Sequence, residues 1–300
     1  LLPGWEQRDD ASRIARALQV LRAADGQGAA EQLVIDRRLV GLYNKLGELG
    51  HAWDSAVRVL AADPGNADNR RVLHGLAERL DRFADLAALL DAAALAARDR
   101  DLDQASQRAL AVELAAVHDE RLGVPADAEL AWQRVLAIDD TDERAYDALE
   151  RIYRVAGRWG ELRDLRIRRE AHSLDAERRR AAALALCDLY EGILDDHDGA
   201  IGAYVRVLDI DSTPSPATQR AFKALERLYA GANRWRELEA LIGRELDALD
   251  GARPAAAAQA AAGRPDPHLA AVADLIFRRA EIRAHHTGDV AGAIDLLDDL

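Results

Sequence analysis

Several residue types are scarce in this chain of 300 residues, and each shortage narrows what the protein can be. A single cysteine, Cys187, excludes an internal disulfide framework and is typical of a reducing compartment, so we expect a cytoplasmic protein. Aromatic residues make up only 5% of the chain. No apolar run reaches the roughly 18 residues that would span a membrane. Glycine and proline are sparse and fall at intervals, as they do between helices.

Lysine and methionine are scarcer still. Only Lys45 and Lys223 are lysines, and methionine is absent, so arginine supplies almost all of the positive charge. This bias indicates a GC-rich bacterial gene. The net charge of −13 argues against general binding to nucleic acid or to an anionic membrane. Because the sequence starts at Leu1 and stops at Leu300 inside a helical pattern, we expect a fragment of a longer protein or a processed product.

One segment is repeated at a constant offset. Residues 148–162 are similar in sequence to residues 224–238, and every matched pair is 76 positions apart. This offset aligns Trp159 with Trp235. A fainter copy lies another 76 residues upstream and carries Phe83 at the same position. Self-similarity at a fixed spacing is typical of stacked repeats, in which each unit buries its apolar face against its neighbours.

A second segment precedes each copy of the first. It begins at Ala52, Ala128 and Ala200 and ends in turn-forming residues such as Asp63-Pro64-Gly65-Asn66, and a fourth, truncated copy begins at Gly292. Apolar residues recur with the period of an α-helix through nearly the whole chain, and no alternating stretch is long enough for a strand. The sequence therefore predicts an all-α protein.

The spacing of these repeats resembles that of the tetratricopeptide repeat (TPR) family. The residues that carry the resemblance are Ala52, Val59, Leu60, Pro64, Leu73, Phe83 and Leu86, and then Ala128, Val135, Leu136, Leu149, Tyr153, Gly157, Trp159 and Leu162. The resemblance implies a right-handed α-solenoid of stacked helix-turn-helix units. Glu150 and Glu226 stand where the family has a small residue, and the closing proline is lost in the second and third copies. The working unit is a pair of hairpins, about 72–76 residues long.

These patterns predict one continuous solenoid over residues 1–300. Residues 1–34 would be a partial upstream repeat, residues 35–250 the TPR-like hairpins, residues 251–268 a flexible insertion, and residues 269–300 a further, truncated hairpin. The insertion is inferred from its glycines, prolines and alanine run, and the next helix is expected to begin near His268.

No pattern of residues indicates an enzyme, a metal or a cofactor. His197 and the pair His285-His286 lie where the repeat predicts tight turns, and no second cluster completes a ligand set. Cys187 occupies a position at which the family packs a small residue between helices, so we interpret it as a buried, inert thiol. A nucleophilic Cys187 assisted by His197 is the alternative.

The repeated aromatic residues are interpreted as packing residues rather than as a binding ladder. Phe83, Trp159 and Trp235 share one repeat position, and Trp132 and Tyr204 share another. Two further tryptophans, at positions 5 and 53, fall outside both positions, and either could be partly exposed.

A stripe of basic residues is the one candidate binding site. In the TPR family the first helix of each hairpin lines the concave face, and the resemblance implies that this face carries Arg71, Arg151, Arg154, Lys223 and Arg227. Such a stripe could hold an acidic peptide or a C-terminal carboxylate. Alternatively, these residues pair with Glu150, Glu226 and neighbouring carboxylates along and between the helices.

Two functions follow from this interpretation. The first is a non-catalytic scaffold or adaptor that binds one or more proteins or peptides through its concave face. The alternative is a regulatory or sensor arm of a larger signalling protein or enzyme whose catalytic domain lies outside this sequence, which is an analogy at the level of the fold. An enzyme within these residues is the least favoured hypothesis.

Overall fold

The structure is a computed structural model that describes residues 10–24, 28–210, 213, 215–260 and 267–298. These residues form helices joined by short connections, with no strand among them, so the predicted all-α class is confirmed. Contacts between residues group the chain into two compact units, residues 1–152 and residues 153–300. The predicted single continuous solenoid stays a prediction.

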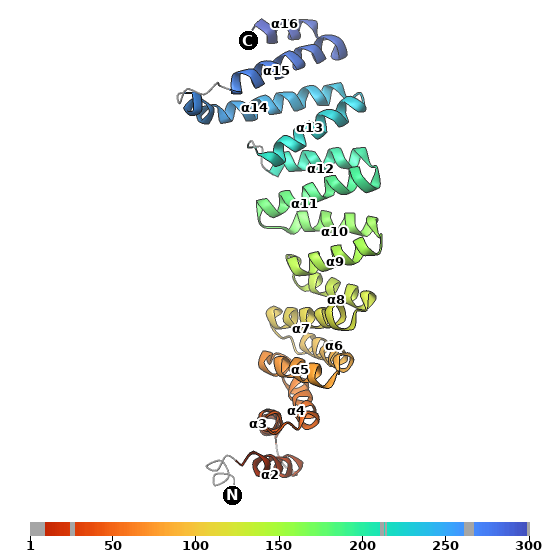
Figure 1. The fold of residues 1–300 in the computed structure, drawn as a ribbon, viewed down its shortest axis with the longest axis vertical. Coiled ribbons are helices and arrows are strands. Elements are labelled where there is room, and N and C mark those ends of the chain that lie inside the picture. Colours follow the sequence, from red (N-terminus) through yellow and green to blue (C-terminus); the bar gives the residue numbers. More distant parts are fainter. Residues whose placement is uncertain (1–9, 25–27, 211–212, 214, 261–266, 299–300) are drawn as a thin grey trace. The chain divides into compact units, whose positions relative to one another are not determined.

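Unit 1 is a series of antiparallel helices (Figure 1). The helices are α2 (Ala11–Ala23), α3 (Ala29–Leu46), α4 (Leu49–Ala62), α5 (Ala67–Leu80), α6 (Phe83–Asp99), α7 (Gln104–Ala116), the π-helical turn η1 (Val117–Leu122), α8 (Pro125–Ile138) and α9 (Glu143–Val155). The boundary between the units falls near the end of α9.

Unit 2 continues the alternation. Its helices are α10 (Trp159–His172), α11 (Ala176–Leu189), the π-helical turn η2 (Tyr190–Leu194), α12 (His197–Ile210), α13 (Pro216–Gly231), α14 (Trp235–Ala260), α15 (Pro267–Ile282), the π-helical turn η3 (Arg283–Thr287) and α16 (Val290–Asp298). The odd-numbered helices from α3 to α15 are the first helices of the hairpins, and the even-numbered helices from α4 to α16 are the second.

Two predicted boundaries need correction. The limit between residues 34 and 35 falls inside α3, because helical periodicity already begins at Ala29. The expected break at residue 251 does not occur, because α14 continues to Ala260 through an alanine-rich stretch of high helix propensity. Residues 261–266 of the predicted insertion lie outside the described residues. The next helix begins at Pro267, beside the predicted start.

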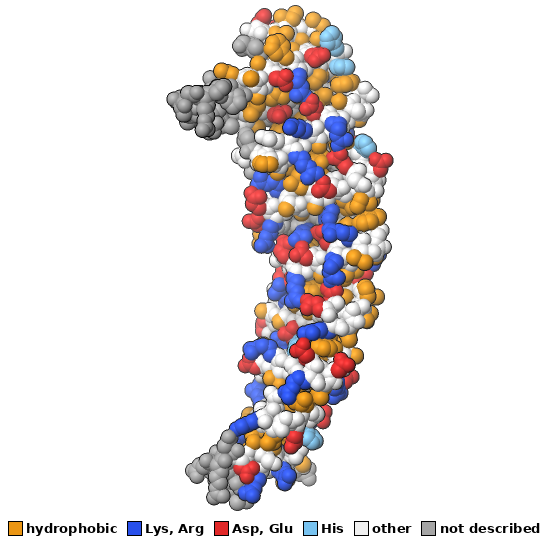
Figure 2. Space-filling model, in the orientation of Figure 1, with side chains coloured by type: hydrophobic (Ala, Val, Ile, Leu, Met, Phe, Trp, Pro, Cys, Tyr) orange, Lys and Arg blue, Asp and Glu red, His pale blue; other side chains and the backbone are white. Residues whose placement is uncertain are grey.

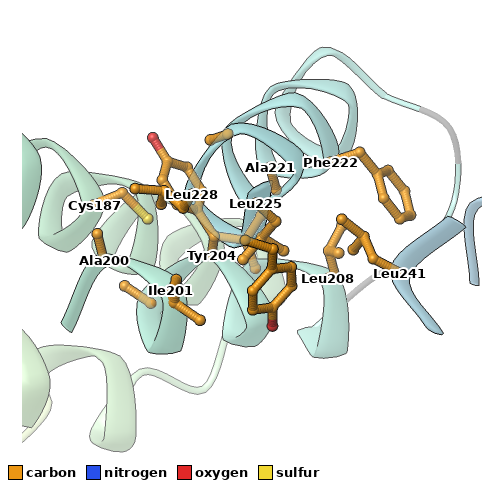
Figure 3. Packing of buried hydrophobic residues seen from close by; sticks show 14 of the residues in the cluster. Cys187, Ala200, Ile201, Tyr204, Leu208, Ala221, Phe222, Leu225, Leu228 and Leu241 are labelled. Atoms are coloured by element: carbon orange, nitrogen blue, oxygen red, sulfur yellow. The ribbon is translucent and has the colours of Figure 1, made fainter. Parts of the chain in front are cut away.

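Within each unit, the helices pack mainly on neighbours in the sequence, such as α3 on α4 in unit 1 and α11 on α12 in unit 2. In unit 2 one apolar cluster runs from Ala183 in α11 to Ile282 in α15. Figure 3 shows part of it, including Tyr204 and Leu208 of α12, Leu225 of α13 and Leu241 of α14. Burial between neighbouring helices, and not one central core, therefore supplies the hydrophobic stabilisation within this unit.

The hairpin turns are of two kinds, and these alternate from α5 to α15, whereas the turn after α3 is of the same kind as the turn after α5. After α5, α9 and α13 the N–H that closes the turn bonds a carbonyl five residues back, as Arg158 does with Tyr153 at 2.9 Å. After α7, α11 and α15 the bond reaches six residues back across a π-helical turn, as Val124 does with His118 at 3.1 Å. This alternation explains why the sequence repeats by pairs of hairpins.

Side chains cap several of the first helices, and Ser215 caps α13. There the hydroxyl accepts a hydrogen bond from the Thr218 N–H at 3.2 Å, and the Thr218 hydroxyl accepts one from the Ser215 N–H at 2.8 Å. Pro216 occupies the first turn, where no N–H partner is needed. Asp103 caps α7 in the same way through the Ser106 N–H, at 2.8 Å.

The aromatic residues separate into two groups. Trp132 and Tyr204 are 1% and 3% exposed, which confirms them as packing residues. Phe83, Trp159 and Trp235 are only half-buried, because they stand at the N-terminal ends of α6, α10 and α14, beside the turns.

The expectation for position 53 was wrong. Trp53 is 2% exposed, because it faces inward from α4 and the Arg82 guanidinium lies 4.5 Å from its ring centroid. Trp5 lies outside the described residues.

Candidate partner-binding surface

The five predicted basic residues do not share one environment. Lys223 and Arg227 line a single groove of unit 2, whereas Arg151 lies in unit 1 and is paired with Asp119. Arg71 is exposed and pairs locally with Asp68, one helical turn away. Arg154 is exposed in the last turn of α9.

The groove of unit 2 lies between α11, η2, α12 and α13. It has a volume of about 560 Å³ and is open to solvent. Its lining consists of Asp188, Glu191, Gly192, Tyr204, Arg220, Lys223, Ala224 and Arg227. The three basic residues follow one another along α13 at positions i, i+3 and i+7, so they project from one side of that helix.

Carboxylates of the preceding hairpin hold the two arginines of this groove. Arg220 pairs with Asp188 of α11, and Arg227 pairs with Glu191 of η2. These partners differ from the predicted Glu150 and Glu226. Arg227 of the predicted stripe therefore has an ion-pair partner on the preceding hairpin, whereas Arg220 was not among the predicted residues.

Glu191 accepts hydrogen bonds from two other residues that line the groove, Tyr204 and Arg227. Its partial burial favours the protonated form, but hydrogen bonds from Tyr204 and Arg227 outweigh that effect and lower the pKa of Glu191 below its ordinary value. Burial, and then the hydrogen bond to Glu191, raises the pKa of Tyr204 to about 12. Glu191 is therefore charged at neutral pH and keeps Arg227 in place.

Unit 1 contains a similar arrangement, although Arg144 pairs with an acid of η1 whereas the corresponding Arg220 pairs with an acid of α11. Arg151 pairs with Asp119 of η1, and the Trp132 indole N–H donates to the same carboxylate at 3.2 Å. Arg144 pairs with Glu120 at 2.8 Å. Repeat positions thus match Trp132 to Tyr204 and Arg144 to Arg220. The sequence already contained this signal, because Arg144 and Arg220 are 76 residues apart, but neither was among the residues predicted for the stripe.

The residue between the two arginines of each helix differs between the units. Lys223 of α13 corresponds to Asp147 of α9. Among the residues that the structure describes, the Lys223 ammonium forms no ion pair, although it lies near enough to Glu245 to offset part of that carboxyl's burial-raised pKa. Figure 2 shows the wider setting, in which acidic and basic side chains are closely interspersed on the drawn face.

The catalytic and metal-site alternatives find no geometric support. Cys187 is fully buried in the apolar cluster (Figure 3), and burial raises the pKa of its thiol to about 12. The His197 ring, which was considered as its base, is largely exposed at the start of α12 and lies 3.8 Å from Asp195. Within the described ranges, no group of three or more His, Cys, Asp or Glu side chains could hold a metal ion.

The described helices also include none that is both long and apolar enough to cross a membrane.

Comparisons with known proteins concern architecture alone. No protein-family model and no curated protein matches the chain. Among solved structures, a tetratricopeptide repeat protein from Parabacteroides merdae is 11% identical and is matched over 81% of this chain and 89% of that chain, with a TM-score of 0.32. PilF of Pseudomonas aeruginosa is 15% identical over 73% and 92%, with a TM-score of 0.34. The TPR2AB domain of yeast Sti1, in a complex with pHSP90, is 11% identical over 90% and 97%, with a TM-score of 0.33.

The fold is a TPR-like helical repeat. The assignment rests on this chain's own hairpins, whose matched turns and packing positions recur in both units.

Proposed function

We propose that this chain is a non-catalytic scaffold that binds a protein partner through the first helices of its hairpins. The observation that carries the proposal is the groove of unit 2, which is lined by Arg220, Lys223 and Arg227 of α13. Asp188 and Glu191 form ion pairs with the two arginines and hold them in place. Side chains already ordered by neighbours lose little entropy when a partner docks.

The chemistry of this groove favours an acidic partner segment. A guanidinium has five N–H donors, so Arg227 can keep its bond to Glu191 and still donate to an incoming carboxylate. The strongly acidic chain as a whole would repel most acidic proteins, so local rather than general attraction would select the partner.

The proposal is tested by capture and by charge reversal. The immobilised chain should retain a specific protein, and the affinity of that protein, once purified, is measured by calorimetry for the wild type, Arg151→Glu and Arg227→Glu. We expect each reversal to weaken binding by about tenfold, since one charge-assisted hydrogen bond is lost and a repulsion is added.

Folding must be separated from binding in this test. Arg227→Glu places two carboxylates together, so Arg227→Gln serves as a milder variant, and thermal unfolding is recorded for all variants. Unchanged affinity in every folded variant would show that these arginines take no part in binding. Failure to retain any protein would count against the scaffold itself.

A further inference from the structure

Unit 1 contains a polar cleft that the proposed function does not use. Two pockets, of about 250 and 220 Å³, adjoin between α2, α3 and α4. Gln19, Tyr43 and His51, one from each helix, line both pockets, so the pockets are the two halves of one cleft. The charged residues of its lining are Arg22, Asp54 and Arg58 in the larger half and Arg16 and Glu48 in the smaller half.

A buried carboxylate fixes two guanidinium groups of the cleft. Arg22 and Arg58 each donate a hydrogen bond from Nε to Oδ1 of Asp36 at 2.8 Å, and Asp36 is 4% exposed. Arg58 also donates from Nη2 to the hydroxyl of Ser55 at 2.9 Å. Both Nη groups of Arg22 and the Nη1 group of Arg58 form no hydrogen bond with the residues that the structure describes. The larger half is therefore lined by cationic side chains that are held in place and still have N–H groups to donate.

A buried hydroxyl shared by the two halves also has no partner. Tyr43 is 4% exposed, and within the described ranges its hydroxyl forms no hydrogen bond. Burial, and then the nearby Glu48, raises the pKa of this hydroxyl, so it is protonated at neutral pH and can donate. Buried polar groups are ordinarily hydrogen-bonded, because a bond left unmade costs free energy. A molecule bound in the cleft would supply the partner.

The charges of the cleft are balanced. Among the described residues, neither Asp54 nor Glu48 forms an ion pair. With the His51 ring counted as neutral, three cationic side chains stand with three carboxylates, which are Arg16, Arg22 and Arg58 with Asp36, Glu48 and Asp54. A ligand of one sign would be attracted by one set and repelled by the other, whereas a ligand that carries both signs has a partner for each.

We propose that this cleft binds a zwitterionic α-amino acid with an uncharged polar side chain. The α-carboxylate accepts hydrogen bonds from the Nη groups of Arg22 and Arg58, and the α-ammonium donates to Asp54. This site is independent of the groove of unit 2 and of the scaffold proposed for it.

The residues common to both halves select the side chain of the ligand. Gln19, Tyr43 and His51 each offer a hydrogen-bond donor or acceptor, and none of them carries a fixed charge. An amide side chain, which both donates and accepts, suits this set.

The test uses the full 300-residue chain and L-glutamine, with two analogues that each lack one charge. Isothermal titration calorimetry at low salt compares L-glutamine with L-glutaminamide, in which an amide replaces the α-carboxylate, and with glutaramate, in which the α-ammonium is absent. We expect each analogue to bind at least about tenfold more weakly, since one charge-assisted contact is lost. Equal binding of glutaramate would identify a simple anion site and overturn the proposal. Absence of L-glutamine binding at about 10 mM would also overturn it.

Two substitutions locate the site, and each has a matched control. Tyr43→Phe removes only the hydroxyl and should weaken L-glutamine binding about fivefold, whereas Tyr229→Phe, at a buried position of unit 2, should leave it unchanged. Asp54→Asn should weaken L-glutamine binding at least about tenfold and leave the weaker binding of glutaramate unchanged, because glutaramate has no ammonium. Asp68→Asn, at an exposed position of α5, is the control for Asp54→Asn.

Thermal unfolding of the ligand-free variants separates binding from folding. Tyr43→Phe should keep the wild-type midpoint, because its hydroxyl bonds no described residue. A lowered midpoint would assign the hydroxyl a structural role and count against the site. Unchanged affinity in both Tyr43→Phe and Asp54→Asn, or an equal loss in the two controls, would overturn the proposal.

Discussion

At the scale of single residues, buried charges hold helices together inside this repeat. Asp36 is 4% exposed and accepts hydrogen bonds from Arg22 of α2 and Arg58 of α4, both at 2.8 Å. One carboxylate thus joins three successive helices of unit 1. A buried carboxylate with two partners contributes little when compared with an apolar residue, but its removal leaves both partners uncompensated.

Asp36→Ala should therefore destabilise unit 1 by about 2 kcal/mol, less than for a fully buried pair because both arginines are about one-third exposed. Asp68→Ala, which removes an exposed pair within one helix, should change stability by less than about 0.5 kcal/mol. Urea unfolding followed by circular dichroism compares the two variants, and equal midpoints would show that Asp36 carries no such role.

Burial of Cys187 gives a prediction about alkaline pH. The pKa of its thiol is raised from 9.0 to about 12 in the folded chain, so the unfolded chain releases this proton first. The stability contributed by the neutral thiol is complete below pH 9 and should be lost progressively as the pH rises towards 12. Cys187→Ala should flatten the dependence of the unfolding midpoint on pH in this window, and native wild-type protein should resist alkylation at pH 8.

At the scale of elements, the turns decide how hairpins combine. Gly123 closes the π-helical turn after α7 with a φ of +63°, a conformation that is costly for a residue with a Cβ. Gly75 lies exposed within α5, with open space where a Cβ would stand. These two glycines therefore have opposite effects on stability.

Gly123→Ala should destabilise the chain by about 1 kcal/mol, since alanine is strained in the left-handed region. Gly75→Ala should stabilise it by about 0.5–1 kcal/mol, because alanine restricts the unfolded chain and favours the helix. Thermal unfolding distinguishes the two signs. A stabilising Gly123→Ala would contradict the role assigned to the π-helical turn.

At the scale of the whole molecule, coupling passes between neighbouring helices. Because the described helices pack on those adjacent in sequence, a defect should stay local and not unfold the entire chain at once. The half-buried Trp159 and Trp235 are poor places to create such a defect. Trp132 of α8 is a better one, because it is fully buried and anchors Asp119 of η1.

Trp132→Ala should cost about 3–5 kcal/mol through the lost burial and the cavity left behind. Amide hydrogen exchange should show lost protection in α7 and α8, whereas α12 to α15 of unit 2 keep theirs. Uniform loss of protection along the chain would instead indicate a single cooperative core.

The sequence by itself determined the helices, the hairpin pairs and the buried positions of residues such as Trp132 and Tyr204. Helical period, capping at Ser215 and turn chemistry are local, so they can be recognised without a structure. The tertiary structure alone decided that Asp119 faces Arg151 and that Glu191 faces Arg227. It also decided that α14 continues past residue 251. Ion pairs between helices depend on how far each helix is rotated and shifted against the next, and that geometry comes from packing rather than from spacing along the chain.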